Sequence, residues 1–237
     1  MLTYKPVTDY TKGIGQKNTG LGNQMFQVAA TIGIAIKNNT QWRLPEWEHP
    51  FLGDFGEPVD PGLYKTKDIP WGYHDVKISK DRAIRGYLQS EKYFEHCEGF
   101  IRDLFAMPPP AYSGDFIAVH IRRGDYKKFP EHHTLLGKDY YDKALSLCPD
   151  LPIIVFTDDA LEAWDAVPKA DLIYTLAPFN DFNLMTTAKY HVIANSSFSW
   201  WGAWLARGEK VIAPRDWFGS KKQWSTEDLY CKNWIVI

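Results

Sequence analysis

Short apolar runs alternate with helical segments along the second half of the chain, and this pattern limits the possible folds more than any other feature. Strands are expected at residues 116–121, 152–156, 172–174, 191–194 and 210–213. Helices are expected between them, at 138–147, around Trp164, at 182–189 and at 200–206. Strands that alternate with helices are joined by right-handed crossovers and form a parallel sheet. The sequence therefore predicts an α/β fold.

The first half has a weaker pattern. A long helix is expected at 23–37, an amphipathic helix at 91–107, and short strands at 2–7 and 40–45. The proline run at 108–110 cannot continue a helix, so we place a domain boundary there. This gives a small, irregular N-terminal half, residues 1–110, and a regular C-terminal half, residues 111–237.

The composition excludes several classes of protein. The 237 residues are 45% hydrophobic and 24% charged, as in a soluble globular protein, and the net charge of −2 argues against a general nucleic-acid binder. Cys97, Cys148 and Cys231 form no Cys-x-x-Cys pair, so neither a zinc site nor a disulfide scaffold is expected. Because the sequence has no signal peptide and no apolar run near the roughly 18 residues of a membrane span, we expect a cytoplasmic protein.

A polar motif follows the apolar run at 116–119, where the first strand of the C-terminal half is expected to end. It contains His120, adjacent guanidiniums at Arg122 and Arg123, and Asp125. Ligands of open α/β sheets bind at the carboxyl ends of strands, and arginine suits bidentate recognition of phosphate. A surface turn with a salt bridge is the alternative, but two arginines with a histidine favour an anion site.

Two further polar clusters follow later strands, at 157–159 and 195–199. Each has a simpler interpretation, because Asp and Ser commonly cap helices at such positions. At one edge of a sheet, however, the three clusters would offer cations for a diphosphate, carboxylates for sugar hydroxyls or base N–H groups, and hydroxyls for phosphate oxygens.

Motifs of several other enzymes are absent from the sequence. No Asp-x-Asp triplet occurs, so we expect no metal and no other cofactor, and the arginines would carry the charge of a leaving group. A P-loop and a Gly-x-Ser-x-Gly elbow are also absent. The glycine-rich stretches 13–18 and 20–25 lack the third glycine of a dinucleotide fingerprint. The second stretch opens the helix at 23–37, and either an ordinary helix start or a site for an anion or polar substrate would explain its glycines.

Three stretches resemble the motifs of the α-1,2-fucosyltransferases, glycosyltransferase family eleven. They are Gly-Leu-Gly-Asn-Gln-Met-Phe-Gln at 20–27, His-Ile-Arg-Arg-Gly-Asp-Tyr at 120–126, and His-Val-Ile-Ala-Asn-Ser-Ser-Phe-Ser-Trp-Trp-Gly-Ala-Trp at 191–204. Residues 211–218 continue the similarity. Thr19 stands where the family has a glycine, Val28 where an aromatic is common, and the chain is short between about 45 and 110.

The resemblance implies a GT-B-like fold of two Rossmann-like halves, with GDP-fucose bound mainly by the C-terminal half and the acceptor facing the N-terminal half. It implies transfer of L-fucose with inversion and without an essential metal, to a glycan acceptor that ends in galactose, with O2 as the expected position. A transferase that uses another GDP-sugar, and a GDP-sugar-binding protein without activity, are the alternatives.

The resemblance also implies roles for single residues. His120 would lie near the guanosine, and Arg122, supported by Arg123, would hold the β-phosphate. The other donor-binding residues would be Asp158 at the base and Asn195, Ser196, Ser197 and Phe198 around the phosphates.

On the acceptor side, Asn23 would lie near the reacting centre, with Gly22 and Gln24 beside it. A general base would remove the proton of the acceptor hydroxyl. The candidates for that base are Asp125 first, then Glu131 and His132.

Overall fold

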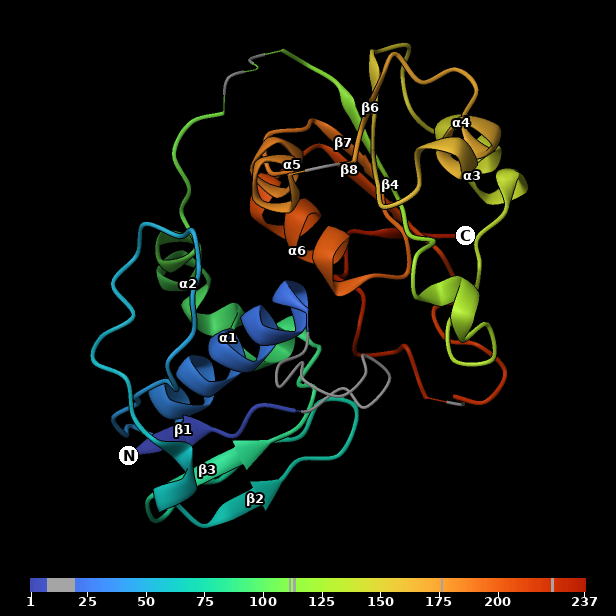
Figure 1. The fold of residues 1–237 in the computed structure, drawn as a ribbon. Helices are drawn as coiled ribbons and strands as arrows, with labels where there is room; N and C mark the ends of the chain where they lie inside the picture. The colour runs from blue at the N-terminus through green and yellow to red at the C-terminus, as the bar shows by residue number, and fades with distance from the viewer. Residues whose placement is uncertain (8–19, 111, 113, 176, 223) are drawn as a thin grey trace. The chain divides into compact units, whose positions relative to one another are not determined.

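The computed structural model describes residues 1–7, 20–110, 112, 114–175, 177–222 and 224–237, so the glycine-rich stretch 13–18 and Thr19 lie outside the described residues. The chain divides into two compact units (Figure 1). The first consists of residues 1–107 and 225–231, and the second of residues 108–224 and 232–237.

The division lies close to the proline run, but it is not a single cut of the chain. Residues 225–231 belong to the first unit, whereas the prediction places all of 111–237 in the second half. Asp228 accepts a hydrogen bond from the backbone N–H of Tyr73 at 2.8 Å and pairs with Lys92 Nζ at 2.6 Å. Contacts this distant in the sequence leave no periodic pattern, so the sequence could not indicate them.

The first unit is built around a three-stranded parallel sheet with the order β1-β3-β2. Its elements in chain order are β1 (Leu2–Tyr4), α1 (Leu21–Lys37), η2 (Pro61–Leu63), β2 (Thr66–Asp68), β3 (Arg82–Arg85), η3 (Glu91–Tyr93), η4 (Glu95–Cys97) and α2 (Glu98–Leu104).

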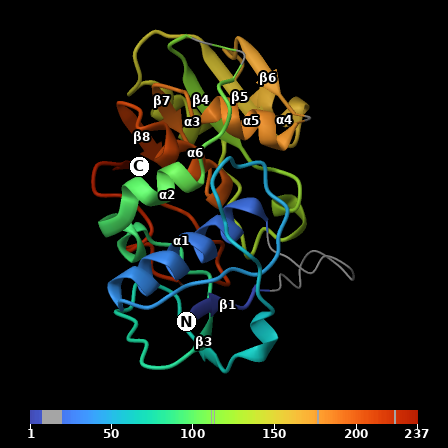
Figure 2. The same cartoon turned by 90° about the vertical axis from the view of Figure 1, so that its left-hand side faces the viewer.

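The long helix α1 is the main element that covers this sheet (Figure 2). Residues Met25 to Ala35 of α1 are all buried. A Cβ atom on Gly33 would lie 2.1 Å from the carbonyl oxygen of Tyr93, so only glycine lets α1 pack directly on η3.

Two expectations for the first unit are wrong. Residues 40–45 form no strand, and Trp42 makes only an isolated bridge to Leu2. The helix expected at 91–107 is divided into η3, η4 and α2, because Phe94 and Cys97 have φ angles of −137° and −127°, outside the helical region. The short strands β2 and β3 lie where the sequence shows little alternation.

The second unit contains a six-stranded sheet with the order β6-β5-β4-β7-β8-β9, and all its strands are parallel. Its elements in chain order are β4 (Ile117–Ile121), η5 (Tyr126–Lys128), α3 (Lys138–Leu145), β5 (Ile153–Thr157), α4 (Ala160–Ala166), β6 (Leu172–Tyr174), α5 (Pro178–Met185), β7 (Tyr190–Val192), α6 (Ser197–Ala206), β8 (Lys210–Ala213) and β9 (Ile235–Val236).

Helices cover both faces of this sheet (Figure 1). Val119 of β4 points to the face where Tyr141 of α3 and Ala163 of α4 pack, and its neighbour Ala118 points to the face of α5 and α6. The α/β prediction is therefore confirmed. All five strands expected here are present, and only the two-residue β9 was not expected.

In the described part of the chain, no helix is both long enough and apolar enough to cross a membrane.

Candidate functional site

The direction in which the chain adds strands changes between β4 and β7. From β4 the chain first builds β5 and β6 on one side, and then β7, β8 and β9 on the other. In open α/β sheets the crevice at such a switch point, at the carboxyl ends of the strands, is where ligands bind. Arg122 follows β4 and Ser197 follows β7, so both flank this point. Asp158 follows β5, whose last residue, Thr157, pairs with Ile121 of β4.

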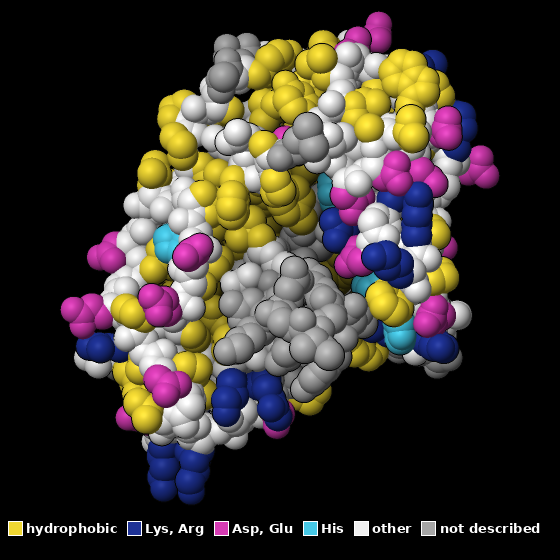
Figure 3. Space-filling model, in the orientation of Figure 1, with side chains coloured by type: hydrophobic (Ala, Val, Ile, Leu, Met, Phe, Trp, Pro, Cys, Tyr) yellow, Lys and Arg dark blue, Asp and Glu magenta, His cyan; other side chains and the backbone are white. Residues whose placement is uncertain are grey.

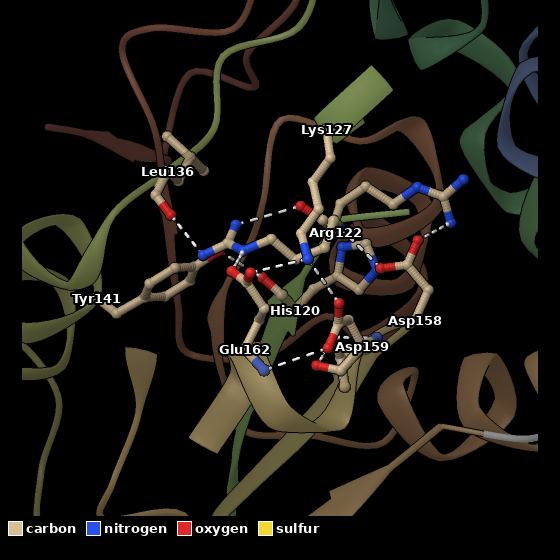
Figure 4. A network of polar contacts seen from close by, with 10 residues as sticks. His120, Arg122, Lys127, Leu136, Tyr141, Asp158, Asp159 and Glu162 are labelled. Atoms are coloured by element: carbon tan, nitrogen blue, oxygen red, sulfur yellow. Dashed lines mark hydrogen bonds and ion pairs between the residues drawn. The ribbon is translucent and has the colours of Figure 1, made fainter. Parts of the chain in front are cut away.

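The guanidinium of Arg122 is held between the carboxylates of Asp125 and Asp158, and Figure 4 shows its contact with Asp158. Its Nε and Nη2 atoms donate to Asp125 Oδ1 at 3.1 and 2.7 Å. Its Nη1 atom forms an ion pair with Asp158 Oδ2 at 2.8 Å. The ring of Tyr126 lies 5.8 Å from the centre of the guanidinium. All three charged side chains are about one-third exposed or less, so the site is open to a ligand.

Asp158 contacts the polar motif through both of its carboxylate oxygens. While Oδ2 pairs with Arg122, Oδ1 accepts a hydrogen bond from the backbone N–H of Arg123 at 2.7 Å. Gly124 leaves room for this carboxylate, because a Cβ at that position would lie 2.6 Å from Asp158 Oδ2. Asp158 thus shapes the loop after β4, whereas the expected contact with a nucleotide base stays a prediction.

Arg123 has a different position from the one expected. Its guanidinium is buried, where Nη2 donates to Leu136 O at 2.8 Å and Nε donates to Glu162 Oε2 at 3.2 Å. Nη1 donates to the carbonyl oxygen of Arg122 at 3.2 Å. These partners hold Arg123 within the protein, and the expectation that it supports Arg122 at a phosphate stays a prediction.

Lys127, Asp159 and Glu162 form a second ionic cluster (Figure 4), and Glu162 also pairs with Arg123. Lys127 Nζ lies 2.8 Å from both Asp159 Oδ2 and Glu162 Oε1. Asp159 also caps α4, accepting from the backbone N–H of Glu162, so the simpler interpretation as a cap holds for this residue. Hydrogen bonding to Lys127 lowers the pKa of Asp159 and of Glu162. Acidic and basic side chains accordingly alternate on the face of this unit that Figure 3 shows near α3 and α4.

His120 is buried beside α6 and is 6% exposed. Its ring lies 5.5 Å from that of Phe198, which in turn packs edge-on against Phe182. Its Nδ1 atom is buried and has no hydrogen-bond partner among the described residues. Burial, with a smaller contribution from Arg122, lowers the pKa of His120 to about 3. His120 is therefore a neutral side chain with an unsatisfied ring nitrogen.

The N-terminus of α6 lies after β7, with Ser196 as its cap. The hydroxyl of Ser196 accepts from the backbone N–H of Phe198 at 3.3 Å, so Ser196 has the simpler role considered for it. This cap also explains why α6 begins at Ser197, earlier than the expected residue 200. A helix N-terminus presents unpaired N–H groups and the positive end of a dipole, which favour an anion.

Asn195 holds loops together rather than facing the crevice. It is 3% exposed, and its Nδ2 atom donates to Thr134 O at 3.0 Å and to Trp217 O at 2.9 Å. Its carbonyl oxygen accepts from Tyr126 Oη at 2.8 Å, and the Tyr126 ring stacks on His133 at 4.0 Å. The structure gives Asn195 these structural contacts, and its expected donor-binding role stays a prediction.

Sequence reasoning missed Tyr126, Gly124 and Glu162 as parts of this site. Glu162 lies three residues after the cap Asp159, which is the spacing of a capping box, and this signal could have found it. Tyr126 carried no signal beyond its place in the motif.

The other base candidates lie in a neighbouring loop. His132 Nε2 lies 3.8 Å from Glu131 Oε1, and Lys221 Nζ lies 3.6 Å from the same oxygen. Hydrogen bonding to its own backbone N–H, together with Lys221, lowers the pKa of Glu131.

In the first unit, the residues expected on the acceptor side are in the first turn of α1. The N-terminal cap residue of α1 is Gly20, and it is followed by Leu21, Gly22, Asn23 and Gln24. Asn23 Oδ1 accepts a hydrogen bond from Gln89 Nε2 at 2.6 Å, and Gln89 is a partner that the sequence did not indicate.

No group of three or more His, Cys, Asp and Glu side chains in the described part of the chain could hold a metal ion. The expectation of a metal-independent reaction stays a prediction.

Comparisons with known proteins identify the family of the chain. The model of glycosyl transferase family 11 matches residues 65–237, well over half of the chain. The chain belongs to this family. The resemblance to this family is thereby confirmed, and the motifs at 120–126 and 191–204 lie within the matched residues.

Three curated relatives are similar to this chain over half of its length or more. An Escherichia coli protein named O-antigen biosynthesis glycosyltransferase WbnK is 38% identical over 136 residues, 51% of this chain and 44% of the relative. An Escherichia coli alpha-1,2-colitosyltransferase is 31% identical over 178 residues, 64% of this chain and 61% of the relative. Galactoside alpha-(1,2)-fucosyltransferase 2 of Rattus norvegicus is 24% identical over 236 residues, 81% of this chain and 66% of the relative. The chain thus spans about half to two-thirds of the length of these relatives.

A solved structure agrees with the fold of the family 11 chain. The crystal structure of NodZ alpha-1,6-fucosyltransferase soaked with GDP-fucose has a TM-score of 0.51 and 12% identity, and the match covers 90% of this chain and 94% of NodZ. This likeness, with the two parallel sheets, gives the chain the GT-B-like α/β fold that was expected.

Proposed function

We propose that this family 11 protein transfers L-fucose from GDP-fucose to a hydroxyl of a glycan acceptor, with galactose O2 as the position and inversion at the anomeric carbon. Membership of the family supports glycosyl transfer. The names of the galactoside alpha-(1,2)-fucosyltransferase and of NodZ soaked with GDP-fucose support the choice of sugar.

One observation carries the proposal. Arg122 and the N-terminus of α6 flank the switch point of the six-stranded sheet, and Tyr126 connects them, with its ring near Arg122 and its hydroxyl on Asn195. A guanidinium and a helix N-terminus at one crevice are suited to a diphosphate. Neutral His120, beside Phe198, would contact the nucleoside through its unsatisfied nitrogen.

In the reaction, the acceptor oxygen bonds to the anomeric carbon of fucose as the bond from that carbon to the β-phosphate oxygen breaks. The electron pair of the broken bond leaves with GDP, and the proton of the acceptor hydroxyl passes to a general base or to water. Negative charge therefore grows on the β-phosphate, and Arg122 would stabilise it together with the N–H groups at the start of α6.

Substitution of Arg122 tests this proposal. We expect Arg122→Ala to lower kcat/KM for fucose transfer by roughly 100- to 1,000-fold, because one positioned donor to a developing oxyanion typically contributes that much. Transfer from GDP-fucose to galactose-terminated acceptors is measured, and NMR of the product identifies the linkage. Lys143→Ala, an exposed cation on α3, is the matched control and should keep wild-type activity. Near-normal transfer by Arg122→Ala would contradict the assignment.

A second donor deserves the same assay, because one relative is named alpha-1,2-colitosyltransferase. The wild-type protein is therefore offered GDP-fucose, GDP-mannose and the GDP derivative of colitose. Faster transfer of colitose than of fucose would show that colitose is the preferred sugar. The roles proposed for Arg122 and α6 would be unchanged.

A further inference from the structure

Asp125 shares the motif of Arg122, and the structure gives its carboxylate a specific partner. Asp125 Oδ1 accepts from both Nε and Nη2 of Arg122, three residues earlier in the chain. The remaining N–H groups of the guanidinium lie at its Nη1 and Nη2 end. Asp158 Oδ2 approaches only one of these two nitrogens, Nη1. The contacts with Asp125 and Asp158 use three of the five N–H groups of Arg122, so one N–H on Nη1 and one on Nη2 remain for a phosphate.

We propose that Asp125 is a positioning residue, which holds Arg122 by its Nε edge so that the guanidinium end meets the phosphate of the donor, and that Asp125 does not take the acceptor proton. The proposal rests on the function above for the identity of the ligand. The contacts of Asp125 suit a residue that orients an arginine, because its Oδ1 accepts from both Nε and Nη2 of Arg122. Holding a flexible arginine in one orientation also reduces the entropy that phosphate binding would otherwise cost.

The local charges sharpen the test. Two carboxylates face one guanidinium here, so a phosphate has to compete with them for Arg122. Asparagine at 125 keeps an oxygen that accepts from Nε and Nη2 but removes one competing charge. Alanine removes both the acceptor and the charge. The two substitutions therefore separate positioning from proton transfer.

We expect Asp125→Asn to bind GDP within about threefold of the wild-type affinity and to keep its fucose transfer within about fivefold. We expect Asp125→Ala to lose about tenfold in GDP affinity, with a matching loss in kcat/KM for the donor. The pH profile of kcat should have the same limbs in both variants as in the wild type. Asp142→Asn, in an exposed ion pair on α3, is the acidic control and should change neither quantity.

A base would behave differently. If Asp125 took the proton, Asn and Ala would both reduce kcat by roughly 100-fold or more, GDP affinity would be unchanged, and the acidic limb of the pH profile would disappear. That result would overturn the proposal.

A readout without a donor separates this proposal from the proposed function. The ¹H–¹⁵N NMR resonance of the Arg122 Nε–H group, assigned by its loss in Arg122→Lys, should keep its position in Asp125→Asn and shift or broaden in Asp125→Ala. An identical resonance in Asp125→Ala and the wild type would overturn the positioning role. If the wild-type protein bound no GDP, the proposed function would fail, and this resonance would still report whether Asp125 holds Arg122.

Discussion

Two histidines of the second unit, His120 and His191, are buried where a proton is disfavoured. They are 6% and 0% exposed, and burial lowers their pKa values from 6.5 to about 3 and about 4. Below pH 6.5 the unfolded chain binds protons that the folded chain does not. The stability that these neutral histidines contribute is therefore complete above 6.5 and is lost as the pH falls towards 4.

This linkage predicts how stability depends on pH. The free energy of unfolding of the wild type should fall between about pH 6.5 and about pH 4.5, with each histidine contributing up to about 1.4 kcal/mol per pH unit. His191→Gln can still donate to Met185 O, the partner of His191, and should lessen this slope. Urea unfolding at several pH values measures it, and His74→Gln, at an exposed position, is the control. An unchanged slope in His191→Gln would contradict the explanation.

For single residues, the sequence indicated the position of the candidate site better than it indicated the contacts of each side chain. The position of Arg122 at a strand end followed from the apolar run before it. The burial of the Arg123 guanidinium was not expected, although adjacent residues of an extended chain point to opposite sides. Arg123 continues the side of Ile121 and Val119, towards α3 and α4, and its guanidinium is buried there. Alternation could have indicated this, whereas the contacts of Asn195 with two distant loops could not have been read from the sequence.

Among the elements, those with long or regular apolar patterns were predictable. The helix α1 and the strands β4 to β8 were expected because their own residues carry the pattern. The strands β2 and β3 were harder to place, since their pairing, β3 with β1 and β2 with β3, defines them more than their local sequence does. The break between η3 and α2 depends on close packing of this segment on α1, which a single helical pattern cannot express.

That packing gives a prediction for α1. Gly33→Ala places a methyl group 2.1 Å from the Tyr93 carbonyl oxygen, so helix and loop must separate, and we expect a loss of about 3 kcal/mol in the free energy of unfolding. Gly99→Ala in α2 is the matched control, because nothing lies within 4 Å of its added Cβ. It should leave stability unchanged or raise it by up to about 1 kcal/mol. Denaturant unfolding compares the two, and equal stability of both variants would refute the close-packing argument.

In the whole molecule, one unit is made of two segments that lie far apart in the sequence. Residues 225–231 complete the first unit, although more than a hundred residues of the second unit precede them. Asp228 is the centre of this connection, through Lys92 and the backbone N–H of Tyr73.

We expect Asp228→Ala to lower the free energy of unfolding of the first unit by about 2 kcal/mol, because it removes a charge-assisted bond and leaves a backbone N–H without its partner. Asp216→Ala, at an exposed position in the same part of the sequence, should have no effect. Hydrogen exchange of amides in α1 and β3 localises the effect to the first unit. Unchanged exchange there in Asp228→Ala would show that the segment contributes nothing.

The same connection has a consequence for synthesis on the ribosome. Residues 1–107 are translated before residues 108–224 of the second unit, but residues 225–231, which complete the first unit, are translated only after them. The first unit therefore stays incomplete while most of the six-stranded sheet is translated. The strand β9 of that sheet, at 235–236, is translated later still. Both units are therefore complete only after residues 225–236 have been translated, and a chain released at residue 224 lacks a part of each unit.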